Sequence, residues 1–96
     1  MNIQIVMPGV NEEKRILKVL TQLDTLGYKT IFVEDGSSDN TKSIILKANF
    51  KNVKLLEHKI NLGKGAALKT GCEYAFSHGA DAVILMDSDG QHSVND

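Results

Sequence analysis

Short apolar runs alternate along the chain with stretches in which apolar residues recur at helical spacing. The runs typical of strands are Ile3–Met7, Thr30–Glu34, Val53–His58 and Ala82–Met86. Helical spacing follows each of the first three runs, in segments that extend from Asn11 to Gly27, from Asp39 to about Ala48 and from Lys64 to His78. Because strands and helices alternate, the pattern predicts an α/β fold with a parallel sheet.

The order of the strands follows from general rules of chain connection. Crossovers between parallel strands are right-handed, and the apolar run Ala82–Met86 is typical of a strand covered on both faces. We therefore expect the strand order 3-2-1-4, with the first two helices on one face of the sheet and the third on the other. Asn11 is the expected N-cap of the first helix, Glu12 and Glu13 suit its positive first turn, and Asp39 is expected to cap the second.

Composition places the chain among ordinary globular proteins. It has 96 residues, of which 42% are hydrophobic and 24% charged, and its net charge is -1. This length favours a single domain. The basic residues are scattered singly, whereas nucleic-acid-binding proteins usually carry a basic patch, so we expect no nucleic-acid partner. No apolar run approaches the roughly 20 residues that span a bilayer, so no membrane segment is expected.

Cys72 is the only cysteine, so no disulfide can form within one chain. Its place in the third predicted helix indicates a packed, inert thiol. The simplest compartment is the reducing cytoplasm, or the cytoplasmic face of the membrane for the full-length protein. The sequence leaves open whether the protein forms a homo-oligomer.

Polar residues gather where each predicted strand ends. The clusters are Pro8–Glu12, Glu34–Ser38, His58 with Asn61–Gly65, and Asp87–Gln91. In open parallel sheets, ligands bind outside the carboxyl ends of the strands. The four clusters therefore predict one ligand site at that edge of the sheet.

The last of these clusters predicts a metal site. Asp87 and Asp89 are two residues apart just past a buried strand, and Gln91 adds a side-chain carbonyl. Mg²⁺ and Mn²⁺ take such oxygen ligands together with substrate phosphates. A solvated turn is the open alternative, because Asp and Gly are favoured in turns anyway. A calcium loop of the EF-hand type is excluded, because its glycine would stand at the sixth position.

The segment Asn61–Ala67 joins a turn to a helix start, and its small residues let a ligand approach the backbone. A helix N-terminus favours anions, and Lys64 could neutralise a phosphate there. A tight connection between strand and helix explains the glycines equally well. The segment matches neither a Walker loop nor a dinucleotide fingerprint, because the required glycines are missing.

Asp35 ends an apolar strand at the predicted ligand edge, and its carboxylate could accept hydrogen bonds from a base or a ribose. His92 follows the acidic motif and is expected to line the same site. His58 and His78 are expected at the surface, near the ends of their elements. The three histidines are not spaced as a metal cluster.

Together, these motifs resemble those of the family 2 glycosyltransferases, which have the Rossmann-like GT-A type fold. The chain looks most like the dolichyl-phosphate mannose synthase group and its bacterial polyprenyl-phosphate relatives. The resemblance covers essentially the whole chain, with matching motifs at Val6–Glu13, Val33–Thr41, Asn61–Ala67 and Asp87–His92. The second motif is the most specific. Val10 stands where an aromatic residue is usual, Glu34 replaces a usual aspartate, and Ser88 stands where alanine is common.

The resemblance implies an inverting glycosyltransferase that transfers a hexose from a GDP- or UDP-linked sugar to an acceptor such as a polyprenyl phosphate. It assigns the nucleotide-sugar contacts to Pro8, Val10, Glu12, Val33, Asp35, Lys64, Asp87, Ser88 and Asp89. It assigns a divalent ion, Mg²⁺ or Mn²⁺, to Asp87, Asp89 and Gln91.

The resemblance also bears on the extent of the chain. No helix or strand is expected after the acidic motif, so residues 1–96 are interpreted as the N-terminal nucleotide-sugar-binding part of a glycosyltransferase domain, truncated after that motif. The catalytic base is then expected beyond Asp96, and the chain alone is expected to be inactive.

Two other function classes remain open. One is a degenerate transferase domain that binds a nucleotide without catalysis, which an assay of sugar transfer would distinguish. The other is a nucleotidyltransferase, which would carry a glycine-rich, basic loop directly after the first strand. The segment Pro8–Glu12 is acidic instead, which ranks this class below the others.

Overall fold

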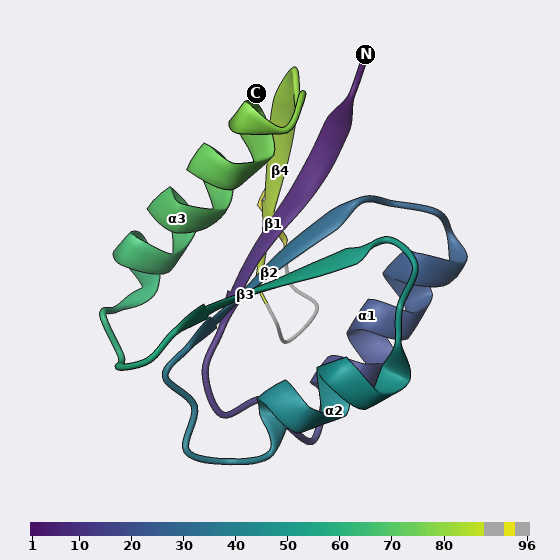
Figure 1. Cartoon of the computed structure of the whole chain (residues 1–96). Coiled ribbons are helices and arrows are strands. Elements are labelled where there is room, and N and C mark those ends of the chain that lie inside the picture. The colour runs from purple at the N-terminus through teal and green to yellow at the C-terminus, as the bar shows by residue number, and fades with distance from the viewer. Residues whose placement is uncertain (88–91, 94–96) are drawn as a thin grey trace.

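A five-stranded sheet with helices on both faces makes up the part of the chain that the structure describes, residues 1–87 and 92–93 (Figure 1). The structure is a computed structural model. The strands are β1 (Ile3–Gly9), β2 (Thr30–Asp35), β3 (Val53–His58), β4 (Ala82–Met86) and β5 (His92–Ser93). The helices are α1 (Ile16–Thr25), α2 (Thr41–Ala48) and α3 (Lys64–Ser77).

Strands β1 to β4 are parallel and lie in the order β3-β2-β1-β4, which confirms the predicted topology. The direction of winding reverses at β1, which pairs with β2 on one side and with β4 on the other. The expectation that no strand follows the acidic motif was wrong, because β5 pairs antiparallel with β4. A strand of two residues is too short to show an alternating pattern in the sequence.

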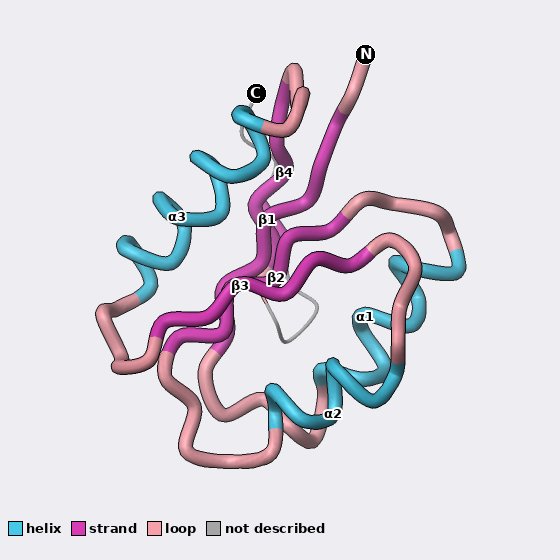
Figure 2. Tube along the Cα trace, viewed as in Figure 1, coloured by secondary structure: helices cyan, strands magenta, loops and turns pink. Residues whose placement is uncertain are grey.

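The helices divide between the two faces of the sheet as predicted (Figure 2). Helices α1 and α2 cover one face, where Met7 and Phe32 of the sheet form a buried cluster with Ile16, Leu20, Leu23 and Ile45. Helix α3 covers the other face, where Val6 and Val33 pack with Ala67 and Ala75. Neighbouring residues of a strand point to opposite faces, so Val6 and Met7 serve different clusters.

Helix α3 lies unusually close to the sheet at Gly71. A Cβ atom added to Gly71 would be 2.4 Å from Val6 Cγ1 and 3.2 Å from Val33 Cγ2. Both valines are fully buried, so neither can move aside into solvent. The absence of a side chain at this position therefore sets the distance between α3 and the sheet.

The first helix begins later than its sequence indicated. Asn11 is not its N-cap: α1 starts at Ile16, after a turn in which the Glu12 carbonyl accepts hydrogen bonds from the amides of Arg15 and Ile16 at 3.0 and 2.9 Å. Asn11 has a φ of 55°, a left-handed conformation that asparagine tolerates better than most residues. Glu12 and Glu13 consequently precede the first helical turn instead of forming it.

The N-cap of α2 is Asn40 and not Asp39 as predicted, although Asp39 lies directly before it. The Asp39 carboxylate accepts a hydrogen bond from the backbone amide of Thr41 at 3.0 Å, directly at the start of the helix. It also accepts one from the amide of Glu13 at 3.3 Å. Asp39 therefore joins the start of α2 to the loop that follows β1.

Candidate functional site

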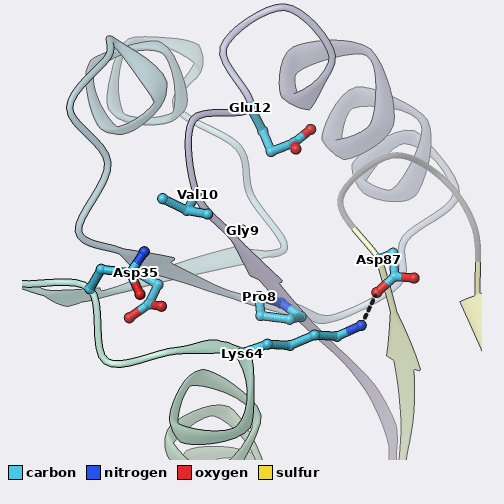
Figure 3. Close-up of a pocket in the computed structure, with 8 residues that line it drawn as sticks. Pro8, Gly9, Val10, Glu12, Asp35, Lys64 and Asp87 are labelled. Carbon is cyan, nitrogen blue, oxygen red and sulfur yellow. Dashed lines mark hydrogen bonds and ion pairs between the residues drawn. The ribbon is translucent and has the colours of Figure 1, made fainter.

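A cavity of about 270 Å³ opens at the carboxyl ends of the parallel strands (Figure 3). Its lining residues are Pro8, Gly9, Val10, Glu12, Asp35, Asn61, Lys64 and Asp87. They come from the ends of β1 and β2, from the loop after β1, from the connection between β3 and α3 with the first residue of α3, and from the residue after β4. Described residues from each of the four polar clusters of the sequence, Asp87 alone from the last, thus meet at one edge of the sheet. Parallel sheets bind ligands at this position, next to the strand where the winding reverses.

One wall of the cavity is formed by the end of β1 and the loop after it. β1 runs two residues past Met7, and its last residues Pro8 and Gly9 pair with Val33 and Glu34 of β2. Several hydrogen bonds then tie the loop after β1 to the loop after β2 and to the start of α2. The Asn11 amide donates to Ser37 Oγ at 2.9 Å, the Ser38 amide donates to Asn11 Oδ1 at 2.9 Å, and the Glu12 amide donates to Thr41 Oγ1 at 3.0 Å.

Glu12 contributes a side-chain oxygen to this wall that can accept a hydrogen bond from a ligand. Among the described residues, its Oε2 atom is buried and has no hydrogen-bond partner. An unsatisfied buried acceptor costs roughly 1–3 kcal/mol, which a ligand hydroxyl or N–H group could recover by donating to it. Because its backbone is held by Thr41, Glu12 can present this acceptor without the loop having to rearrange.

Asp35 is 3% exposed and forms the opposite wall. Its carboxylate accepts hydrogen bonds from the amides of Leu62 at 3.0 Å and Gly63 at 2.9 Å, and its Oδ1 lies 2.8 Å from His58 Nδ1. Burial alone would raise the pKa of Asp35, but the Leu62 amide, His58 and the Gly63 amide together hold it below the ordinary value of 3.8. Asp35 is therefore an anion at neutral pH.

Lys64 and Asp87 form an ion pair across the cavity, with 2.8 Å between Lys64 Nζ and Asp87 Oδ1 (Figure 3). Their side chains are 63% and 44% exposed, so solvent weakens the attraction. Lys64 is the first residue of α3, where the helix dipole also favours an anion. An exposed pair of this kind can open for a ligand at little cost in free energy.

The structure places one member of the predicted metal motif. Asp87 lies at the edge of the cavity, whereas Ser88, Asp89 and Gln91 lie outside the described residues. Of His92, only the backbone in β5 is described. Within residues 1–87 and 92–93, no three His, Cys, Asp or Glu side chains gather as a metal site would require. Asp87 offers carboxylate oxygens of the kind that Mg²⁺ and Mn²⁺ prefer.

The side chains of Val33 and His58 lie outside the lining of the cavity. Val33 was assigned to the nucleotide contacts, but its side chain is fully buried on the face that α3 covers, and it does not line the cavity. The expectation that His58 lies at the surface was wrong, because its side chain is 11% exposed and sits between Asp35 and Thr70. His78 is exposed as expected, and its ring stacks on Tyr74 with 3.9 Å between centroids.

The register of the neighbouring strands explains the contact between His58 and Asp35. β2 and β3 are parallel, and their register places Asp35 directly opposite His58. An acidic and a basic residue at the last positions of neighbouring strands are close enough to interact. Asn61 and Gly9 also line the cavity without having been singled out as ligand contacts.

A comparison with protein families identifies the family of the chain. Residues 4–96 match the sequence profile described as glycosyl transferase family 2. The chain belongs to this family. The parallel sheet in the order β3-β2-β1-β4 agrees with the GT-A type fold that the resemblance implied.

Several known proteins align with almost the whole length of this chain. A dolichyl-phosphate beta-glucosyltransferase of Trichomonas vaginalis is 33% identical, over 98% of the chain and 32% of that protein. The UDP-N-acetylglucosamine–dolichyl-phosphate N-acetylglucosaminyltransferase of Methanococcus voltae is 35% identical, over 98% of the chain and 43% of that protein. The dolichyl-phosphate beta-glucosyltransferase of Mus musculus is 32% identical, over 92% of the chain and 31% of that protein.

The chain spans well under half the length of each of these relatives, between 31% and 43%. The alignments therefore include only the part of each relative that corresponds to this sheet and its cavity. None of the chain's helices among the described residues has both the length and the apolar character that crossing a membrane requires.

Proposed function

We propose that this chain forms the donor site of an inverting glycosyltransferase that takes a hexose from a GDP- or UDP-linked sugar. The observation that carries the proposal is the cavity at the switch point of the sheet. There the unpartnered acceptor of Glu12, the anionic Asp35 and the Lys64–Asp87 pair surround one space. Membership of glycosyl transferase family 2 supports the same reading.

In this proposal the nucleoside lies between the two walls of the cavity. Pro8 and Val10 offer apolar contact to the base, and Asp35 accepts a hydrogen bond from a base N–H group. Glu12 Oε2 accepts one from a ribose hydroxyl, which would satisfy the buried oxygen. Uracil and guanine both carry N–H donors, so Asp35 fits either base. A cavity of about 270 Å³ is at the small end for ligand sites and suits part of the donor.

The diphosphate is proposed to lie at the start of α3. Lys64 would turn from Asp87 to a phosphate oxygen, adding its charge to that of the helix N-terminus. This exchange would free both oxygens of Asp87, which we propose as a ligand of Mg²⁺ or Mn²⁺ together with Asp89 and Gln91. When bound, such an ion stabilises negative charge on a departing nucleoside diphosphate.

Inversion follows from a single displacement at the anomeric carbon. An acceptor oxygen forms the new bond on the face opposite the nucleoside diphosphate, whose bond to the sugar breaks, and a base accepts the acceptor's proton. We propose that this base lies beyond residue 96. The chain's own contribution is to bind and orient the donor.

The acceptor is proposed to be a polyprenyl phosphate, at the cytoplasmic face of a membrane. The support comes from relatives whose names specify dolichyl-phosphate acceptors, in Trichomonas vaginalis and in Methanococcus voltae. Cys72, the only cysteine, is compatible with a reducing compartment.

A transfer assay on the complete gene product tests the proposal. Purified protein would be given radiolabelled UDP-glucose, UDP-N-acetylglucosamine or GDP-mannose, with a polyprenyl phosphate and Mn²⁺ or Mg²⁺. We expect labelled lipid from at least one donor, and much less from Glu12→Ala, which removes the acceptor. The matched control is Glu73→Ala, which removes the carboxylate of an exposed glutamate on α3.

Two outcomes would contradict the proposal in different ways. If nucleotide sugars bind but none is transferred to lipid or water, the degenerate binding module becomes the better account. If Glu12→Ala and Glu73→Ala behave alike, the cavity is not the donor site.

A further inference from the structure

A bridge of three side chains, one of them the cavity residue Asp35, lies next to the cavity. His58 Nδ1 is 2.8 Å from Asp35 Oδ1, and His58 Nε2 is 2.9 Å from Thr70 Oγ1. The side chains of His58 and Asp35 are 11% and 5% exposed. The bridge therefore joins the ends of β2 and β3 to the second turn of α3, and both ring nitrogens are used.

The bridge fixes the orientation of the Asp35 carboxylate. His58 and the Leu62 amide share its Oδ1, while the Gly63 amide donates to Oδ2. A carboxylate that could rotate would lose these bonds to the backbone. The two amides belong to the segment that leads directly into Lys64 and the start of α3.

The same segment is pressed against the end of β2. A Cβ atom added to Gly36 would lie 2.5 Å from the Asn61 nitrogen and 2.6 Å from the Ile60 carbonyl carbon. Gly36 also has a φ of 72°, which side-chain-bearing residues rarely adopt. The loop before α3 is therefore held by close packing on one side and by the Asp35 carboxylate on the other.

We propose that His58 is a positioning residue of the donor cavity. It orients Asp35, and Asp35 in turn fixes the Leu62–Gly63 backbone and with it the location of Lys64. The inference rests on the proposed function for its effect on donor binding. His58 itself does not line the cavity, so it acts through Asp35 and the loop.

Two substitutions separate positioning from simple packing. The amide nitrogen of Asn stands where Nδ1 of His stands, so His58→Asn can still donate to Asp35. The amide of Gln reaches the place of Nε2, so His58→Gln can keep the contact with Thr70 but not the same one with Asp35. If His58 only fills space, the two variants should behave alike.

The first measurement is hydrogen exchange at the Leu62 and Gly63 amides in the complete gene product, which needs no nucleotide. We expect exchange in His58→Gln to be faster than in wild type by about tenfold, the equivalent of one hydrogen bond to a charged group. His58→Asn should stay within about threefold of wild type, since it keeps the bond to Asp35. Urea unfolding of each variant shows whether a change in global stability accounts for the difference.

The second measurement is the kinetics of sugar transfer with varied donor. His58→Gln should raise the KM for the donor by about tenfold and leave kcat nearly unchanged, because the cavity is less well formed in the free enzyme. His58→Asn should restore most of the affinity. The control is His78→Asn, at the opposite end of α3, which should match wild type.

Equal exchange rates in His58→Gln and wild type would overturn the positioning role, whether or not the protein binds a nucleotide. Faster exchange with an unchanged KM would overturn its link to the cavity. If wild type transfers no sugar and binds no nucleoside diphosphate, the proposed function fails, and the exchange rates still decide whether His58 positions the loop.

Discussion

The close contact between α3 and the sheet leads to a prediction about Gly71. Replacing Gly71 with alanine adds one methyl group, which would lie 2.4 Å from Val6 Cγ1 and 3.2 Å from Val33 Cγ2. Carbon atoms in contact normally stand about 3.5–4.0 Å apart. Both valines are fully buried and stiff at χ1, so α3 itself must move away from the sheet.

Gly65→Ala supplies the matched control, because Gly65 lies in the same helix and a Cβ there meets no atom within 4 Å. Alanine is favoured over glycine in helices by about 1 kcal/mol, a gain that both variants share in part. Overpacking a core typically costs about 1–3 kcal/mol. The free energy of unfolding of Gly71→Ala should therefore lie about 1–3 kcal/mol below that of Gly65→Ala.

Urea-induced unfolding of the complete gene product, followed by circular dichroism, measures this difference. The same displacement of α3 should shift Lys64, so donor affinity should fall in Gly71→Ala. Gly71→Ala at least as stable as Gly65→Ala would refute the close contact between α3 and Val6.

Further predictions concern charge and the thiol. The pKa values of Asp35 and Asp39 are lowered from 3.8, so the stability that they contribute is present above pH 4 and should be lost as pH falls through their folded pKa values. Acid titration of the free energy of unfolding should show a shallower decline for Asp39→Asn. Lys64→Gln should weaken nucleoside diphosphate binding by about three- to tenfold, leaving nucleoside binding unchanged, whereas Lys69→Gln should alter neither. Burial raises the pKa of the Cys72 thiol, so iodoacetamide should alkylate it more slowly than free cysteine at pH 8.

The sheet could be predicted because each strand and helix is recognisable from the pattern of its own residues. The bounds of β3 and β4 agree with their apolar runs, and the strand order follows from alternating elements with right-handed crossovers. The cavity followed in turn, since polar residues at the ends of parallel strands must meet at one edge. The packed Cys72 was also predictable from its place on a helix.

The errors concern residues whose roles depend on distant partners. Asn11 looked like a helix cap, but its side chain accepts a bond from Ser38, 27 residues away, and its backbone turns left-handed instead. His58 looked exposed because its partners Asp35 and Thr70 lie 23 and 12 residues away.

Calorimetric titration of UDP and GDP into the complete gene product, with and without Mn²⁺ or Mg²⁺, tests the central claim most directly. We predict binding of at least one nucleoside diphosphate, strengthened by the ion by roughly 1–3 kcal/mol, as is typical of coupled sites. Asp87→Asn should reduce this coupling, and Asp81→Asn, which changes a carboxylate bonded to the Asn2 amide at the far end of β1, should not. Folded wild-type protein that binds neither nucleotide, with or without either ion, would contradict the account.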